Sequence, residues 1–174
     1  MNRNLPLQLA VLLALVTLLS CPLAPGSDDL PECAADAYEP NDSLRESYRL
    51  STIEEASPEA SFTATLDTPG DGDFFRFHAE EGVHSCSIKD DQQYQVRIRL
   101  TTPAGQDYDL ALYNNKLDLI DTSSTPGDAE ETITFSWNGK CGIDDSRSFR
   151  IEVSSPAPGG SCGQYTLYID MWNL

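Results

Sequence analysis

The chain has 174 residues, with 28 Asp and Glu against 11 Lys and Arg, and its formal net charge is −17 at pH 7. This length suits one ordinary domain with appendages. A hydrophobic content of 40% is enough to build a core, which excludes wholesale disorder. The strong acidity and the lack of a basic cluster argue against nucleic acid and anionic membrane surfaces as partners, and they are compatible with the binding of cations.

The first 20 residues are typical of an export signal. One positive charge in residues 1–4 precedes an apolar run, residues 5–19, that is shorter than the roughly 20 residues of a membrane-spanning helix. The run ends in Leu-Leu-Ser-Cys (residues 18–21), which resembles the lipobox of bacterial lipoproteins, where the Cys carries the lipid. We therefore predict a signal peptide at residues 1–20, a lipid-anchor Cys21 with a tether at residues 21–35, and export to the bacterial cell envelope. An ordinary signal peptide and a secreted protein remain the alternative.

Four more cysteines follow Cys21, namely Cys33, Cys86, Cys141 and Cys162. The oxidising environment outside the cytoplasm favours two disulfides. Structural zinc is the rival interpretation, but the four residues are scattered and no Cys-x-x-Cys pair occurs.

From residue 36 onward, short apolar or alternating runs are separated by Gly, Pro, Asp and Asn. The alternation is cleanest in residues 94–100, where the polar set Gln95, Arg97 and Arg99 should face solvent. A helical signal is confined to residues 43–55, where Ser43 and Glu46 are spaced as in a capping box. Eight short strands with regular turn signals predict an all-β sandwich over residues 36–174. The predicted strands are residues 61–66, 74–78, 94–100, 108–113, 117–121, 131–137, 148–153 and 165–171.

Five sequence blocks in a fixed order carry a family resemblance. They are Asp-Ala-Tyr-Glu-Pro-Asn-Asp-Ser (36–43), Gly-Asp-Gly-Asp-Phe-Phe-Arg-Phe (70–77), Asp-Tyr-Asp-Leu-Ala-Leu-Tyr (107–113), Phe-Arg-Ile-Glu-Val (149–153) and Gly-Gln-Tyr-Thr-Leu-Tyr-Ile (163–169). The set resembles the bacterial pre-peptidase C-terminal domain, whose relatives include the collagen-binding domains of clostridial collagenases. The resemblance implies a jelly-roll-like antiparallel β-sandwich of about eight strands without catalytic activity. Some relatives bind calcium, and some bind collagen or other insoluble polymers.

Two acidic blocks suggest a calcium site. The first places oxygen-bearing side chains at Glu39, Asn41 and Asp42, and the second places Asp71 and Asp73 on either side of a glycine. Calcium takes six to eight oxygen ligands, for which four carboxylates and one amide are a suitable start. The alternative is that these residues are solvated turn formers on an acidic surface.

The resemblance supports the same ligand set and extends it. Calcium-binding relatives carry their ligands in these two blocks, and Thr65 matches a further ligand position. Ala37 stands where relatives with two ions carry an acid, and Asp36 beside it is a possible substitute. We therefore expect one calcium ion, with Glu39, Asn41, Asp42, Asp71, Asp73 and Thr65 as its candidate ligands.

Strand parity predicts the disulfides. If each turn reverses the chain, the loop before residue 74 and the loop after residue 153 share one end, and Cys162 lies in the second of these loops. Docking of the Glu39 block through its metal would bring Cys33 to the same end. The loops with Cys86 and Cys141 fall at the other end. The prediction is Cys33–Cys162 with Cys86–Cys141, and the alternative is Cys141–Cys162 with Cys33–Cys86.

No catalytic residue is predicted. Residues 159–163 match Gly-x-Ser-x-Gly around Ser161, but a strand follows where a nucleophile elbow needs a helix, and no histidine follows His84. The leading hypothesis is a non-catalytic, calcium-stabilised binding or adhesion module on the cell envelope. It would be a monomer that touches the membrane only through its lipid and binds an extracellular polymer or protein. The alternative is an accessory of a separate exported peptidase or hydrolase, acting in targeting, as a chaperone or as an inhibitor.

Four aromatic residues are candidates for a polymer-contacting face, because Tyr and Trp are enriched at interfaces. They are Tyr113, Tyr165, Tyr168 and Trp172. At strand positions such residues also serve as core, so the sequence leaves both roles open.

Overall fold

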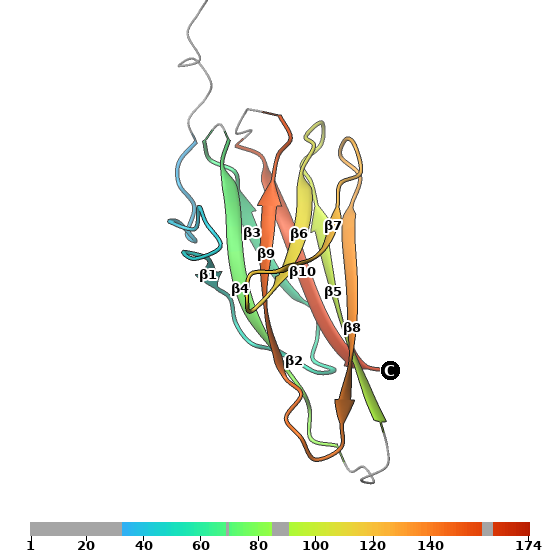
Figure 1. Ribbon diagram of the computed structural model, residues 1–174. Coiled ribbons are helices and arrows are strands. Elements are labelled where there is room, and N and C mark those ends of the chain that lie inside the picture. The colour runs from blue at the N-terminus through green and yellow to red at the C-terminus, as the bar shows by residue number, and fades with distance from the viewer. Residues whose placement is uncertain (1–32, 69, 85–90, 158–161) are drawn as a thin grey trace, which may run out of the picture.

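The protein is a sandwich of two β-sheets (Figure 1). The computed structural model describes residues 33–68, 70–84, 91–157 and 162–174. The strands are β1 Tyr48–Arg49, β2 Ile53–Glu54, β3 Ala60–Thr65, β4 Gly72–Glu80, β5 Asp91–Thr101, β6 Asp109–Asn114, β7 Leu119–Ser123, β8 Glu131–Lys140, β9 Arg147–Ser154 and β10 Gln164–Asn173. The described part of the chain contains no helix with the length and apolarity needed to cross a membrane.

The strand order confirms the predicted fold class. One sheet has the order β1-β4-β9-β6-β7, with β2 also paired to β4, and the other has the order β3-β10-β5-β8. From β3 onward the chain changes sheet at every connection except β6–β7, so most neighbours in a sheet are distant in sequence. All pairs are antiparallel apart from β1 and β2 on β4. This arrangement is a jelly-roll-like antiparallel β-sandwich.

The core lies between the two sheets and follows from period-two alternation. In β5, Tyr94, Val96, Ile98 and Leu100 are buried, while the side chains between them face away from the core. In β10 the same pattern buries every second residue from Tyr165 to Met171. One face of each sheet is therefore apolar and packed, and the other is free to carry polar groups.

All eight predicted strands are present, with bounds within three residues of the expected ones. Of the one or two turns expected in residues 43–55, one forms at residues 43–46, where the Glu46 N–H donates to the Ser43 carbonyl at 3.0 Å. Ser43 and Glu46 form one of the two contacts of a capping box, because the Glu46 N–H donates to the Ser43 hydroxyl at 3.3 Å, and that hydroxyl in turn donates to the Glu46 carboxylate at 3.0 Å. The chain then enters β1 and β2, whose backbones pair with β4 at the sheet edge, so tertiary pairing overrides the local helical signal.

Candidate metal centre

The segment before β1 is fastened to one end of the sandwich by backbone contacts. Asp36 accepts hydrogen bonds from the N–H groups of Tyr38 and Thr65, both at 2.8 Å, and so ties the segment to the end of β3. The N–H of Phe74 donates to the carbonyl of Asn41 at 2.9 Å and ties the segment to β4. The Glu39 block therefore lies beside the β3–β4 connection, where the sequence analysis expected it.

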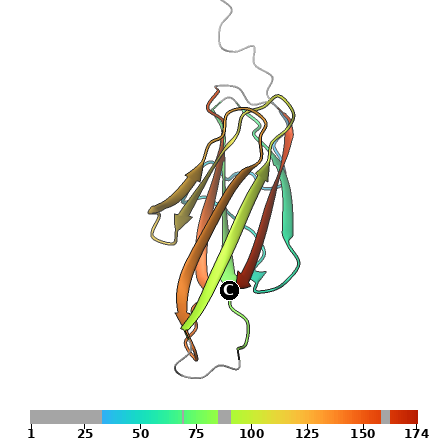
Figure 2. The same ribbon diagram turned by 90° about the vertical axis from the view of Figure 1, so that its right-hand side faces the viewer.

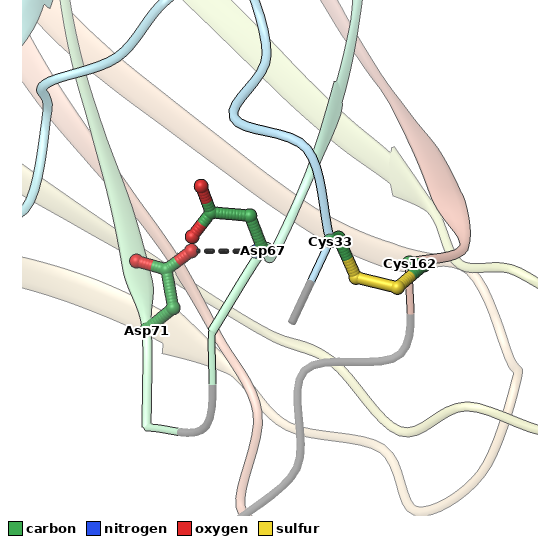
Figure 3. Close-up of a disulfide and its surroundings, with 4 residues drawn as sticks. All are labelled: Cys33, Asp67, Asp71 and Cys162. Carbon is green, nitrogen blue, oxygen red and sulfur yellow. Dashed lines mark hydrogen bonds between the residues drawn. A yellow bond between two sulfur atoms is a disulfide. The ribbon is translucent and has the colours of Figure 1, made fainter. Parts of the chain in front are cut away.

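A disulfide joins the same segment to the residues before β10. Cys33 and Cys162 are bonded, with their Cα atoms 5.3 Å apart, beside the turn that holds Asp67 and Asp71 (Figure 3). This is the first of the two predicted pairs. Cys141 is also disulfide-bonded, and its predicted partner, Cys86, lies outside the described residues.

Three carboxylates converge where the two segments meet. Glu39, Asp71 and Asp73 each offer an oxygen atom, and these atoms all lie within 4.8 Å of one another. No ion pair with Lys, Arg or His involves any of the three among the described residues. The acids therefore share a small volume without a counter-charge from the described chain.

Hydrogen bonds hold each carboxylate in place. Asp73 is fully buried and accepts the hydroxyl of Tyr165, which is itself fully buried in β10. Asp71 accepts the backbone N–H of Asp67 at 2.8 Å, as the dashed line in Figure 3 shows. Glu39 accepts the backbone N–H of Asn41 at 3.0 Å. These contacts orient the oxygens before any ligand arrives.

Burial makes these carboxyls weaker acids than usual. It raises the pKa of Asp73 to about 8; the Tyr165 hydroxyl opposes this, and the nearby acids, Asp71 first, add to it. Burial likewise raises the pKa of Glu39 to about 6, against the N–H bond from Asn41. The pKa of Asp71 is raised too, again chiefly by burial. At neutral pH without a cation, Asp73 therefore keeps its proton.

Asn41 brings an amide into the cluster and is completely buried. In the structure its side-chain oxygen faces only acceptors, the carboxylates of Glu39 and Asp73. With the amide turned over, its nitrogen would donate to Asp73 Oδ1 at 3.2 Å and to Glu39 Oε1 at 2.9 Å. The first orientation suits a cation among the oxygens, and the second suits a cluster without one.

Two more predicted ligands, Asp42 and Thr65, are not among the three converging carboxylates. Asp42 is exposed and outside the converging group, although its charge contributes to the raised pKa of Glu39. Thr65 contributes its backbone N–H to Asp36. Both carboxylate oxygens of Asp36 are occupied by backbone N–H groups, so Asp36 fastens the segment in place. Cys21, the predicted lipidation site, lies outside the described residues.

Tyr165 is the residue of this site that sequence reasoning missed, since it was considered for an exposed aromatic face or for the core but not as a partner of Asp73. The other three aromatics do not form one face either. Tyr168 and Trp172 lie on the outer face of the four-stranded sheet, under the guanidinium groups of Arg99 and Arg97. Tyr113 lies on the other sheet and donates to Glu152 at 2.6 Å.

The histidines take part in local contacts. The His78 Nδ1 lies 3.1 Å from the Ser148 hydroxyl, and the two residues are register partners in β4 and β9. The His84 Nε2 lies 2.7 Å from the Glu55 carboxylate. Ser161 of the Gly-x-Ser-x-Gly match lies outside the described residues.

Comparison with known proteins identifies similar folds. No protein-family model and no curated protein sequence matches the chain. The pre-peptidase C-terminal domain of a collagenase from Bacillus anthracis matches with a TM-score of 0.44 and 14% identity, over 71% of this chain and 96% of that domain. The family that the sequence motifs resemble is thus represented among the similar solved structures.

Two carbohydrate-binding modules are similar as well. The module of a Cellvibrio mixtus lichenase, solved with cellotriose, matches with a TM-score of 0.32 and 16% identity, over 63% of this chain and 75% of that one. A family 35 module from an environmental isolate matches with a TM-score of 0.32 and 13% identity, over 67% of this chain and 80% of that one.

Proposed function

We propose that the protein is a non-catalytic binding module of the bacterial cell envelope whose β-sandwich is stabilised by calcium. The observation that carries this proposal is the convergence of the carboxylates of Glu39, Asp71 and Asp73, beside which the buried side-chain amide of Asn41 lies. Hard oxygen donors of this kind are those that calcium prefers. A bound calcium ion would supply positive charge that offsets the repulsion among the carboxylates.

The residues of the chain act as a clamp in this proposal. Glu39 and Asn41 belong to the segment before β1, whereas Asp71 and Asp73 belong to the β3–β4 connection and β4. A cation held by both sets links the segment to the sheet, next to the Cys33–Cys162 disulfide. Tyr165 fixes the orientation of the Asp73 carboxylate by donating to it. The role of the calcium ion in this proposal is thus structural. The polymer or protein partner would bind to the outer faces of the sandwich.

The proposal extends to location and partners. A disulfide between Cys33 and Cys162 fits an oxidising compartment, which supports export. The rest of the proposal follows from the sequence analysis. The protein would be a monomer, would be anchored through a lipid on Cys21, and would bind an extracellular polymer or protein.

Thermal unfolding of the purified protein tests the calcium clamp. Calcium should raise the melting temperature at concentrations of about 10⁻⁴–10⁻³ M, the affinity range of extracellular modules. Magnesium should do less, because it requires a small octahedral shell and gives up water reluctantly. A chelator should reverse the effect, and no shift at millimolar calcium would refute the clamp.

Substitutions locate the response within the chain. Asp73→Asn and Glu39→Gln should each abolish the calcium shift, since each removes a converging carboxylate. Glu80→Gln is the matched control, because Glu80 is exposed at the opposite end of the same strand as Asp73. A calcium shift that survives Asp73→Asn, or that is lost in Glu80→Gln, would contradict the assignment.

A further inference from the structure

The arginines on the two outer faces of the sandwich differ in whether they form ion pairs. On the four-stranded sheet, Arg97 pairs with Asp170 at 2.7 Å, and Arg99 pairs with Glu59 at 2.7 Å and with Glu130 at 3.1 Å. These charges are neutralised within the chain. With 28 acidic residues against 11 basic ones, such pairing is the expected state for an arginine in this protein.

The six-stranded sheet, which faces the viewer in Figure 1, carries three arginines in one row. Strand register places Arg49 of β1 beside Arg76 of β4, and Arg76 directly opposite Arg150 of β9. None of the three forms an ion pair among the described residues. Like charges directly opposite each other destabilise a sheet. A row of unpaired arginines in an acidic protein therefore calls for an explanation outside folding.

The row lies in a hollow of the surface. A cavity of about 540 Å³ is lined by Arg49, Arg76, His78, Arg150 and neighbouring residues, none of them acidic. It adjoins a second hollow of about 490 Å³, with which it shares His78. The lining of the second hollow includes the basic residues Lys116 and Arg147 and one acid, Asp118, whose carboxylate accepts the side-chain amide of Asn114 at 3.0 Å. We call the surface formed by Arg49, Arg76, His78, Lys116 and Arg150 the basic groove.

The β6–β7 hairpin forms one wall of the basic groove. In Figure 2 this hairpin stands away from the body of the sandwich. Its tip residue Asn115 lines both hollows, and a guanidinium nitrogen of Arg150 lies 3.4 Å from its carbonyl oxygen. The Nε of Arg150 is buried and has no hydrogen-bond partner. Because this Nε is buried, a ligand would meet the outer nitrogens of the guanidinium, whose hydrogen bonds to the Asn115 carbonyl and side-chain oxygens are long, at 3.4 Å each.

We infer that the basic groove binds a linear polysaccharide that carries carboxylate groups. This inference rests on the proposed function, because it names the polymer that the module binds and the face that binds it. Guanidinium groups recognise carboxylates through paired hydrogen bonds. Amide and hydroxyl groups such as those of Asn115 and Ser148, both in the groove lining, suit the hydroxyls of a sugar.

Shape and charge favour this class of ligand over others. Two adjoining open hollows suit an extended chain better than a small molecule. The net charge of −17 repels a densely charged polymer such as nucleic acid, which carries about one charge per 1.7 Å of duplex axis. A polysaccharide with one carboxylate per sugar is repelled less. An acidic peptide would find no free backbone partners on the face of a sheet whose strands already pair with one another.

Calorimetric titration of the purified protein with short oligogalacturonates tests the inference, with neutral dextran oligomers, poly-glutamate and single-stranded DNA as comparison ligands. Oligogalacturonates should bind, and more weakly as salt rises. Arg76→Gln and Arg150→Gln should each weaken binding by roughly ten-fold or more, as expected for the loss of a charge-assisted contact.

Arg45→Gln is the matched control, because Arg45 is exposed, lies outside the groove and carries the same charge. It should change the affinity less than two-fold. The melting temperatures of Arg76→Gln and Arg150→Gln should not fall, since each relieves a like-charge pair. A stability loss that accounts for the weaker binding would overturn the inference.

Equal binding of neutral dextran, preferential binding of poly-glutamate or DNA, or equal effects of Arg45→Gln and Arg76→Gln would also overturn it. Binding of a neutral polymer without any binding of oligogalacturonate would refute the basic groove and leave the proposed function standing. Calcium binding is tested separately, by the change in melting temperature that calcium causes.

Discussion

The substitution Asp73→Asn tests the electrostatics of the metal centre most directly. It replaces a carboxyl group that can ionise with a neutral amide and keeps the shape of the side chain. Burial raises the pKa of Asp73 from an ordinary 3.8 to about 8 in the folded protein. The folded state therefore binds this proton more tightly than the unfolded state does. The resulting stability is fully present below about pH 4 and is lost as the pH rises through about 8.

The magnitude follows from the same two pKa values. A pH of 7 lies about 3 units above the ordinary pKa that Asp73 has in the unfolded chain. Each unit changes the free energy of unfolding by about 1.4 kcal/mol. At pH 7 without calcium, the free energy of unfolding of the wild type should therefore be lower by up to about 4 kcal/mol than that of a variant whose residue 73 does not titrate. An unfolding entropy of about 2.1 cal/mol/K per residue gives about 0.3 kcal/mol/K for the sandwich. The largest expected difference in melting temperature between Asp73→Asn and wild type at pH 7 is therefore about 13 °C.

Differential scanning calorimetry from pH 5 to 9 in chelator is the assay. The melting temperature of Asp73→Asn minus that of wild type should increase with pH and level off above about pH 8. Calcium at ten times its dissociation constant should then stabilise wild type alone by about 1.4 kcal/mol, or about 5 °C, and narrow the gap. A difference that does not change with pH, or a variant that keeps its calcium response, would refute the reasoning.

Three further predictions concern stability. The double substitution Cys33→Ser/Cys162→Ser should lower the free energy of unfolding in urea by about 4–5 kcal/mol, because the bond closes a long loop; a loss below about 2 kcal/mol would contradict this. Gly139→Ala should lower stability by about 1–3 kcal/mol, because its Cβ would lie 2.4 Å from a ring carbon and 2.7 Å from a carboxylate oxygen, and an unchanged melting temperature would show that these neighbours yield. Glu131→Ala should cost about 1–3 kcal/mol in urea unfolding, because the buried carboxylate accepts the N–H of Thr125 at 2.7 Å, and a neutral result would mean that water replaces it.

The fold was largely predictable because alternation is a local property. Every second residue from Tyr94 to Leu100 in β5 and from Tyr165 to Met171 in β10 is apolar, and the sandwich buries those residues. The short strands β1 and β2 have two residues each and carry no period. They form because the edge of β4 is open for pairing, and this depends on the tertiary structure and not on the local sequence. The contact between Ser43 and Glu46 was predicted correctly, and one turn forms there before the chain extends into β1.

The candidate metal centre was predictable as far as its carboxylates and amide lie in short blocks. Glu39, Asn41, Asp71 and Asp73 are spaced like turn and ligand residues, and the fold brings the two blocks together. Tyr165 was not predictable from spacing, because it comes from β10 and meets Asp73 across the sandwich. Its parity with the buried residues of β10 was the one available signal that it points inward.

The basic groove has the least local signature of all, since the sequence contains no basic cluster. Core packing creates it. A slip of β9 by one residue would expose Phe149 and Ile151, which are buried, so the core fixes the register between β9 and β4. That register places Arg150 opposite Arg76 on the outer face. Packing dictates which positions meet there but not their charge, because outward positions on a sheet accept almost any polar residue. Two arginines that meet on this face without an ion pair to any described acid are therefore a feature that stability does not require, and ligand binding is the reason we offer for it.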